Sequence, residues 1–165
     1  MVKAVIEITD AIENDKWDDV WPLVTKDNVN YGDSFPIRMA VMKRRVPEVK
    51  KLLEHGADIN VWGNHLLSTA VVNNDLEMVK VLLDAGIECG EKTEPVENAI
   101  IAGNPDMINT LLPRFDHSVS GFLILRMLLN RKMFDHIRTI LKSPNTSFED
   151  VTWFFINYLS MEKQK

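Results

Sequence analysis

Residues 47–89 read PEVKKLLEHGADINVWGNHLLSTAVVNNDLEMVKVLLDAGIEC and contain one pattern twice. The segment VKKLLEHGADIN begins at Val49, and the related segment VKVLLDAGIECG begins 30 residues later at Val79. Similarity at a fixed period is typical of repeat proteins, in which each unit buries its apolar face against its neighbours. The sequence therefore predicts a stack of like units.

Each copy has the features of a helical hairpin. Val49, Leu52 and Leu53 are spaced as i, i+3 and i+4, so they share one face of a helix. Gly56 follows, where a helix end favours the left-handed backbone that glycine adopts without steric cost. A shorter apolar segment precedes this helix, and Ala40 near its centre lets two antiparallel helices approach closely. The unit is predicted to be two helices and a loop.

These motifs resemble the ankyrin repeat. Residues 35–40, FPIRMA, occupy the place of that family's Thr-Pro-Leu-His-x-Ala, and residues 54–60, EHGADIN, match its helix end almost letter for letter. Arg38 stands where the family has its histidine. The resemblance implies an all-α fold, an ankyrin-type helical-hairpin solenoid, and a protein as partner.

The small-residue position recurs through the chain and sets the domain organisation. It is occupied by Ala11, Ala40, Ala70, Ala99 and Leu128, at intervals of 29, 30, 29 and 29 residues. We expect one domain over residues 1–165, with about five repeats. Its parts are a capping repeat at 1–30, central repeats at 31–60, 61–90 and 91–113, a divergent repeat at 119–142, and a capping helix at 146–160.

The repeats are shorter than the roughly 33 residues usual in ankyrins. The missing residues fall where the family projects a β-hairpin finger, so we expect short turns there. Pro36 is expected to start a short helix, because proline is pre-organised for helix entry. Gly121 is expected to lie in a turn. Short repeats of this kind also resemble those of viral and phage ankyrin proteins.

Charge is unevenly distributed along the chain. The net charge of −5 disfavours a general nucleic-acid binder, because phosphate contacts need concentrated Lys and Arg. Residues 38–51 nevertheless hold six bases against Glu48, and residues 84–106 hold six acids against Lys92. We interpret these segments as solvated faces. The alternative is a nucleic-acid-linked role, by basic-patch contact or by acidic mimicry of DNA.

No pattern for catalysis or for metal binding is present. The four histidines share no metal-type spacing with one another or with Cys89, and no phosphate loop or nucleophile motif occurs. We expect no metal, no cofactor and no enzymatic activity. A single cysteine excludes an internal disulfide, and no run approaches the roughly 20 apolar residues of a membrane span. A cytoplasmic protein that does not enter a membrane is expected.

The leading expectation is a non-catalytic protein-binding module, which the resemblance to viral ankyrins extends to an inhibitor of a host factor in the host cytoplasm. In an ankyrin stack, residues just past the small-residue position face a concave groove. Here that row mixes apolar and basic groups, which predicts a partner with an acidic surface and an apolar centre. The groove residues are Met42, Lys43, Val72, Asn73, Ile101, Asn130 and Arg131.

Further residues predicted to contact a partner or a second copy lie at loop tips and in the C-terminal helix. Tyr31, Trp62, Asn64 and Phe122 fall at junctions between repeats, where the rings are either binding anchors or folded back over helix ends. In the last helix Phe148, Val151, Phe155 and Leu159 share one face at 100° per residue. Trp153 and Phe154 lie outside that face, and a homo-oligomer could form through them.

Overall fold

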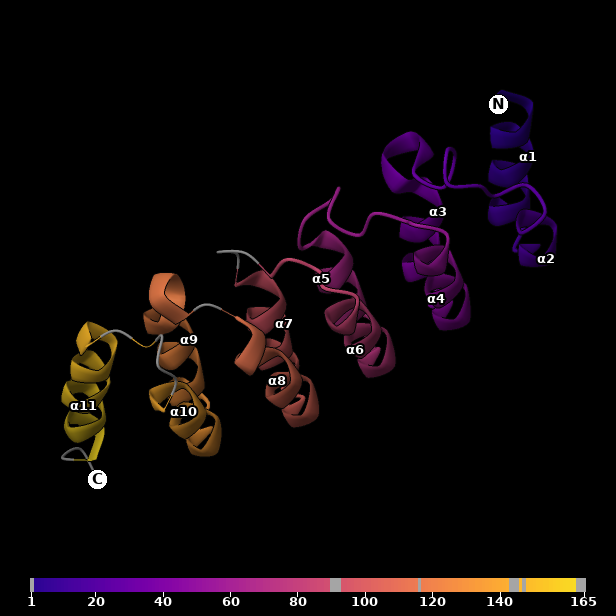
Figure 1. Ribbon diagram of the computed structural model, residues 1–165. Helices are drawn as coiled ribbons and strands as arrows, with labels where there is room; N and C mark the ends of the chain where they lie inside the picture. Colours follow the sequence, from indigo (N-terminus) through magenta and orange to yellow (C-terminus); the bar gives the residue numbers. More distant parts are fainter. Residues whose placement is uncertain (1, 90–92, 116, 143–145, 147, 163–165) are drawn as a thin grey trace. The chain divides into compact units, whose positions relative to one another are not determined.

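The computed structural model describes the backbone of residues 2–89, 93–115, 117–142, 146 and 148–162 (Figure 1). Side chains are described for these residues except 117–120, 122, 148, 150, 159, 161 and 162. The chain forms two compact units, Met1–Glu88 and Cys89–Lys165. Both units are helical, and the residues with a described backbone include no β-strand.

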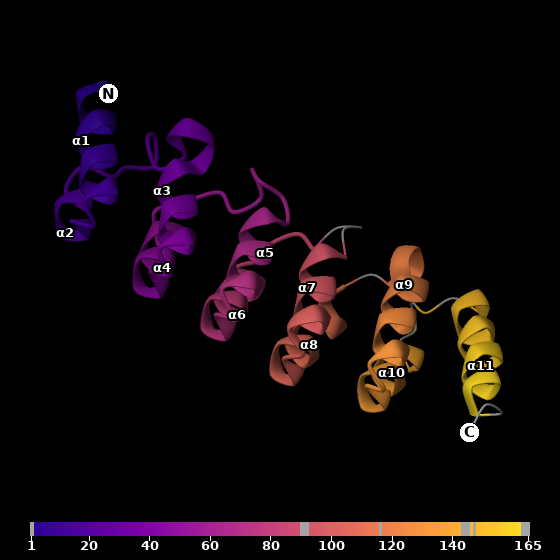
Figure 2. The same cartoon turned by 180° about the vertical axis from the view of Figure 1, so that it is seen from behind.

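The first unit consists of three helical hairpins. The first hairpin pairs α1 with α2, the second α3 with α4, and the third α5 with α6; α3 also packs against α1 and α5, and α4 against α6. Figure 2 shows the two helices of each hairpin side by side from behind. The bounds are α1 Val2–Glu13, α2 Trp17–Val20, α3 Tyr31–Met42, α4 Val46–Glu54, α5 His65–Val72 and α6 Leu76–Asp84.

The second unit repeats this arrangement and ends in a single helix. The hairpin of α7 and α8 packs through α7 on α9, α9 pairs with α10, and α11 covers α9. A 3-10 helix, η1, extends α8. The bounds are α7 Glu94–Ala102, α8 Pro105–Leu111, η1 Leu112–Arg114, α9 His117–Asn130, α10 Phe134–Leu141 and α11 Phe148–Glu162.

The turn between the two helices of a hairpin is the same in all five repeats. The residue four positions after the small one has a left-handed backbone with φ between 54° and 68°. The next amide donates a hydrogen bond back to the carbonyl of the small residue, at 2.8 Å from Arg45 to Ala40 and 2.9 Å from Met133 to Leu128. The left-handed residues are Asp15, Arg44, Asn74, Gly103 and Lys132. The predicted repeat frame therefore extends to the divergent copies.

The predicted core positions are buried. Ala11, Ala40, Ala70, Ala99 and Leu128 are all inaccessible or nearly so, as are Val49, Leu52, Val79 and Leu82 on the second helices. Gly56 and Gly86 end those helices with φ of 89° and 83°, a region that side chains disfavour. The sequence predicted these features correctly.

Asparagine side chains join the loops of neighbouring repeats in the first unit. Asn30 Oδ1 accepts a hydrogen bond of 2.7 Å from the Asp58 amide, and the Asn30 side-chain amide donates to the Gly56 carbonyl at 3.0 Å. Asn60, 30 residues further on, likewise accepts from the Glu88 amide at 2.9 Å. These bonds satisfy loop backbone that β-hairpin fingers would otherwise pair.

Two local expectations concern a helix start and a glycine turn. Gly32, Asp33 and Ser34 form a left-handed turn at the start of α3, so the regular helix begins after Ser34 and Pro36 lies in its first turn, as predicted. The turn predicted at Gly121 is wrong, because Gly121 lies inside α9. One glycine costs a helix only about 1 kcal/mol relative to alanine, which the surrounding apolar residues offset.

Burial along α11 does not follow the apolar face that its helical period predicts. Phe154 is 7% exposed whereas Phe155 is 53% exposed. Because α11 is apolar on several sides, its helical period alone did not show which side would meet α9. Phe148 and Leu159 lie outside the described side chains, and Val151 is half-buried. Since Phe154 is buried and Trp153 half-buried, the pair does not form the exposed surface that the homo-oligomer hypothesis needed.

Lys132→Gly is predicted to stabilise the protein. Lys132 has φ of 58°, whereas the equivalent position of the preceding repeat carries Gly103. Glycine removes a left-handed strain of about 1 kcal/mol, so the urea midpoint should rise. Arg131→Gly is the control, because Arg131 has no positive φ and glycine there should lower the midpoint. Equal effects of the two changes would contradict the role assigned to this turn.

Candidate protein interface

Apolar side chains are exposed at the groove position of successive repeats. Met42 is 60% exposed at the end of α3, and Val72 is 69% exposed at the end of α5. Each lies two residues past the buried alanine of its hairpin, and α3 packs on α5. Ile101 is likewise exposed at the same position of its own repeat in the second unit. Equivalent placement in each hairpin distinguishes these residues from scattered surface apolar groups.

The polar residues predicted to face the groove differ in how far they are exposed. Lys43 is half-buried, and its ammonium group donates a hydrogen bond of 3.0 Å to the Glu13 carbonyl. Asn73 is also half-buried. In the second unit, Asn130 and Arg131 are exposed at the turn between α9 and α10. In the first unit the apolar residues at these positions are thus exposed, while the polar residues beside them are half-buried.

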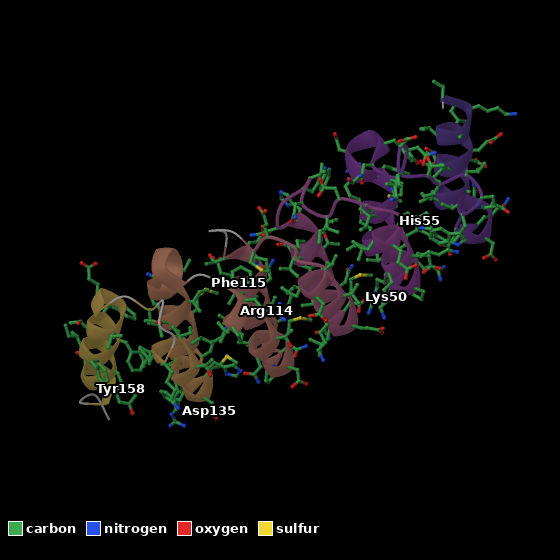
Figure 3. All side chains as sticks on the ribbon, in the orientation of Figure 1. Lys50, His55, Arg114, Phe115, Asp135 and Tyr158 are labelled. Carbon is green, nitrogen blue, oxygen red and sulfur yellow. The ribbon has the colours of Figure 1, made fainter. Side chains whose placement is uncertain are left out.

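The six bases of residues 38–51, here called the basic segment, are all engaged within the first unit. Arg45 pairs with Asp15, and both Arg44 with Asp75 and Lys50 with Glu77 approach to 3.5 Å. Each of these pairs links neighbouring repeats, and Figure 3 shows Lys50 on α4. The other three contacts are Lys43 with the Glu13 carbonyl, Arg38 over the Trp62 ring, and Lys51 over the Trp21 ring. The segment is a solvated face, as predicted, with Arg44, Arg45 and Lys50 58%, 43% and 54% exposed, and its ion pairs join neighbouring repeats.

Trp62 lies at a loop tip and is 43% exposed. The Arg38 guanidinium sits 4.1 Å from the ring centroid, and the His65 ring meets it edge-on at 5.9 Å. Val61 beside it is also exposed, a neighbour that the sequence analysis did not single out. The ring is held in place by a cation and still offers one face to a partner.

Tyr31 is packed more tightly than Trp62. Its hydroxyl lies 2.9 Å from Thr9 Oγ1 on α1, and its ring lies 5.7 Å from that of Phe35. Burial raises the pKa of the phenol, although the hydrogen bond with Thr9 opposes this. Tyr31 therefore braces α3 against α1, and only part of its ring is available to a partner.

The other two residues predicted to contact a partner at junctions between repeats are Asn64 and Phe122. Asn64 is only 5% exposed, so the expectation that it contacts a partner is corrected. It occupies the residue before α5, where the chain enters the helix and is covered by it. Phe122 lies within α9, and its side chain is outside those described.

The described residues contain no cluster of three or more His, Cys, Asp or Glu that could hold a metal ion. Cys89 is half-buried, and this burial raises the pKa of its thiol, which lowers the fraction of reactive thiolate. None of the helices with described residues is long and apolar enough to cross a membrane.

These features define an all-α protein of stacked helical hairpins. The family model described as "Ankyrin repeats (3 copies)" matches residues 8–93 and 37–120, which together cover more than half of the chain. The chain belongs to the ankyrin repeat family. No curated protein and no solved structure matches it.

Trp62→Ala is predicted to cost only about 1 kcal/mol of unfolding free energy, the worth of an exposed cation–π contact. Trp17→Ala is the matched control, because Trp17 is buried, stacks on Trp21 at 6.1 Å and donates from Nε1 to Asp15 at 3.0 Å. Removing it should cost about 3–5 kcal/mol. Urea unfolding measures both. Equal losses would show that Trp62 is a core residue.

Proposed function

We propose that the protein is a non-catalytic binding module that engages a partner protein through the exposed apolar positions of its first unit. The observation that carries this proposal is the pair Met42 and Val72, both large, apolar and exposed at equivalent positions of adjacent hairpins. Exposed apolar groups that recur on packed neighbours favour a contact surface. Ankyrin repeats generally serve protein interactions, which supports the same conclusion.

Trp62 is proposed as an anchor beside this surface. It projects from the loop between the second and third hairpins, and the Arg38 stack fixes its orientation. A ring that is already held loses little freedom on binding, so its contact area contributes more fully to affinity. We expect Trp62→Ala to weaken partner binding by about 2 kcal/mol, as for other tryptophan anchors.

Repeat length and charge support a more specific proposal about the function and the partner. The repeat length supports an inhibitor of a host factor, by resemblance to viral and phage ankyrins, and the single cysteine suits a cytoplasmic site of action. An acidic partner surface would need an available base beside the contact in the first unit. Lys43 suits it poorly, because that ammonium group is bonded to the Glu13 carbonyl.

A nucleic-acid role through the basic segment of the first unit is not favoured. Phosphate binding draws on bases that are free to release counterions. The basic segment instead pairs with Asp15, Asp75 and Glu77 or covers tryptophan rings. Acidic mimicry of DNA would need a dense array of carboxylates, whereas the six acids of residues 84–106 are flanked in the sequence by the basic residues of 38–51 and 126–132.

The double variant Met42→Gln with Val72→Gln tests the proposed surface. Glutamine keeps the helix propensity and removes the apolar contact, so the fold should persist while partner binding weakens at least about tenfold. The measurement is affinity capture from extract of the native source, quantified by mass spectrometry against the parent protein.

The matched control is Val2→Gln with Ile6→Gln, which removes two exposed apolar side chains from α1 away from the groove positions. A partner retained by this control and lost by the groove variant supports the proposal. A partner captured equally by both variants would place the contact elsewhere.

A further inference from the structure

The second unit contains a hollow of about 260 Å³ between α10 and α11, which the proposed function does not use. From α10 it is lined at positions i, i+3, i+4 and i+7, a single helix face, by Phe134, Ile137, Arg138 and Leu141. Three of these side chains are apolar and one is a cation. The hollow therefore combines an apolar wall with a charged edge.

Aromatic rings of α11 form the opposite wall. Phe154 is buried and stacks on Tyr158 at 5.7 Å, and Phe134 meets Tyr158 edge-on at 6.0 Å. At the rim, Phe134 and Phe155 remain largely exposed. Tyr158 is labelled on α11 in Figure 3. Exposed phenylalanines around an aromatic floor are a common feature of partner-binding sites.

The size of the hollow limits what can occupy it. A cavity of about 150 Å³ holds one benzene ring, whereas pockets for drug-sized ligands measure roughly 300–1,000 Å³. A hollow of about 260 Å³ lies between the two. It suits one or two large apolar side chains of a partner better than a drug-sized free ligand.

The charge beside the hollow is positive and available. Arg138 has a side chain 69% exposed, and its described ion pair, at 3.5 Å, is with Asp135, whose side chain is 94% exposed. Such an exposed pair contributes little, and the guanidinium keeps further donors for a carboxylate. Figure 3 labels Asp135 on α10.

More bases lie near Arg138 in the sequence. Residues 131–142 hold four bases against Asp135, and among the described side chains no ion pair engages Arg131, Lys132 or Lys142. The acids of α11 are Glu149 and Asp150 in its first turn, before the residues that line the hollow, and Glu162 at its last position. In the basic segment of the first unit, by contrast, the ion pairs are with acids of neighbouring repeats.

We propose that the hollow between α10 and α11 is a second docking site, for an acidic protein segment that inserts a large apolar side chain between the aromatic rings. Carboxylates flanking that side chain would meet Arg138 and the neighbouring bases. This site goes beyond the proposed function and lies in the other unit, so either can fail without the other.

The test uses the full chain and a fluorescein-labelled synthetic peptide with a central Phe-Leu pair flanked by aspartates and glutamates. Fluorescence anisotropy measures binding. The acidic peptide should bind saturably, and the affinity should fall at least about tenfold when lysines replace the acids or alanines replace Phe-Leu. Absence of saturable binding, or equal binding of the lysine peptide, would overturn the proposal.

Paired variants locate the site. Phe155→Ser should weaken binding of the acidic peptide about tenfold, whereas Ile156→Ser, a similarly exposed neighbour outside the hollow, should not.

Arg138→Gln should weaken binding of the acidic peptide at low salt, and this effect should disappear near 1 M salt, where the Debye length is about 3 Å. Arg126→Gln, an exposed base on α9, is the control. Equal effects within either pair would refute the assignment.

Self-association and loss of folding are each tested directly. Sedimentation of the parent chain and of Phe155→Ser detects a second copy, and self-association that Phe155→Ser abolishes would assign the hollow to a homo-oligomer and overturn the proposal. Thermal melts verify folding. If Phe155→Ser lowers the melting temperature, the comparison of Arg138→Gln with Arg126→Gln decides.

Discussion

The fold depends on the turn that lets two antiparallel helices lie close together. A small or buried residue sits at the helix contact, and four positions later one residue takes the left-handed backbone that reverses the chain. The amide after it bonds back to the small residue's carbonyl, so the turn satisfies its own polar groups. Because this device recurs from Asp15 to Lys132, the hairpins of each unit are built alike, and neighbours within a unit can pack by repetition of one contact.

The same constraint governs which side chains remain for binding. The residue directly past the small position is buried, as Val41 and Val71 are, whereas the next residue, Met42 or Val72, stays exposed although it is apolar. The nearby bases face a neighbouring repeat and pair across it, as Arg44 does with Asp75. Charge in the first unit thus joins repeats, while apolar groups form the surface that a partner can use. In the second unit the bases around Arg138 have no such neighbour among the described side chains.

The terminal helix explains the aromatic hollow. In the hairpins each helix has a partner, but α11 is single and packs chiefly on α9. The outer side of α10 is then covered only in part, by Phe154 and Tyr158, and Phe134 stays at the rim. An incomplete cap of this kind leaves apolar area that a second chain can bury.

The sequence by itself determined the repeat period, the hairpin unit, the buried alanine series and the helix ends at Gly56 and Gly86, because these follow from local spacing and from backbone preferences that act within one repeat. Only the tertiary structure decided that Asn64 is buried, that Arg38 covers Trp62 and that α11 turns Phe154 inward. Each of these outcomes depends on contacts between residues of different elements. A helix with apolar groups on several sides has no preferred inner face until its neighbours are in place, so its period cannot reveal which rings are buried and which remain exposed.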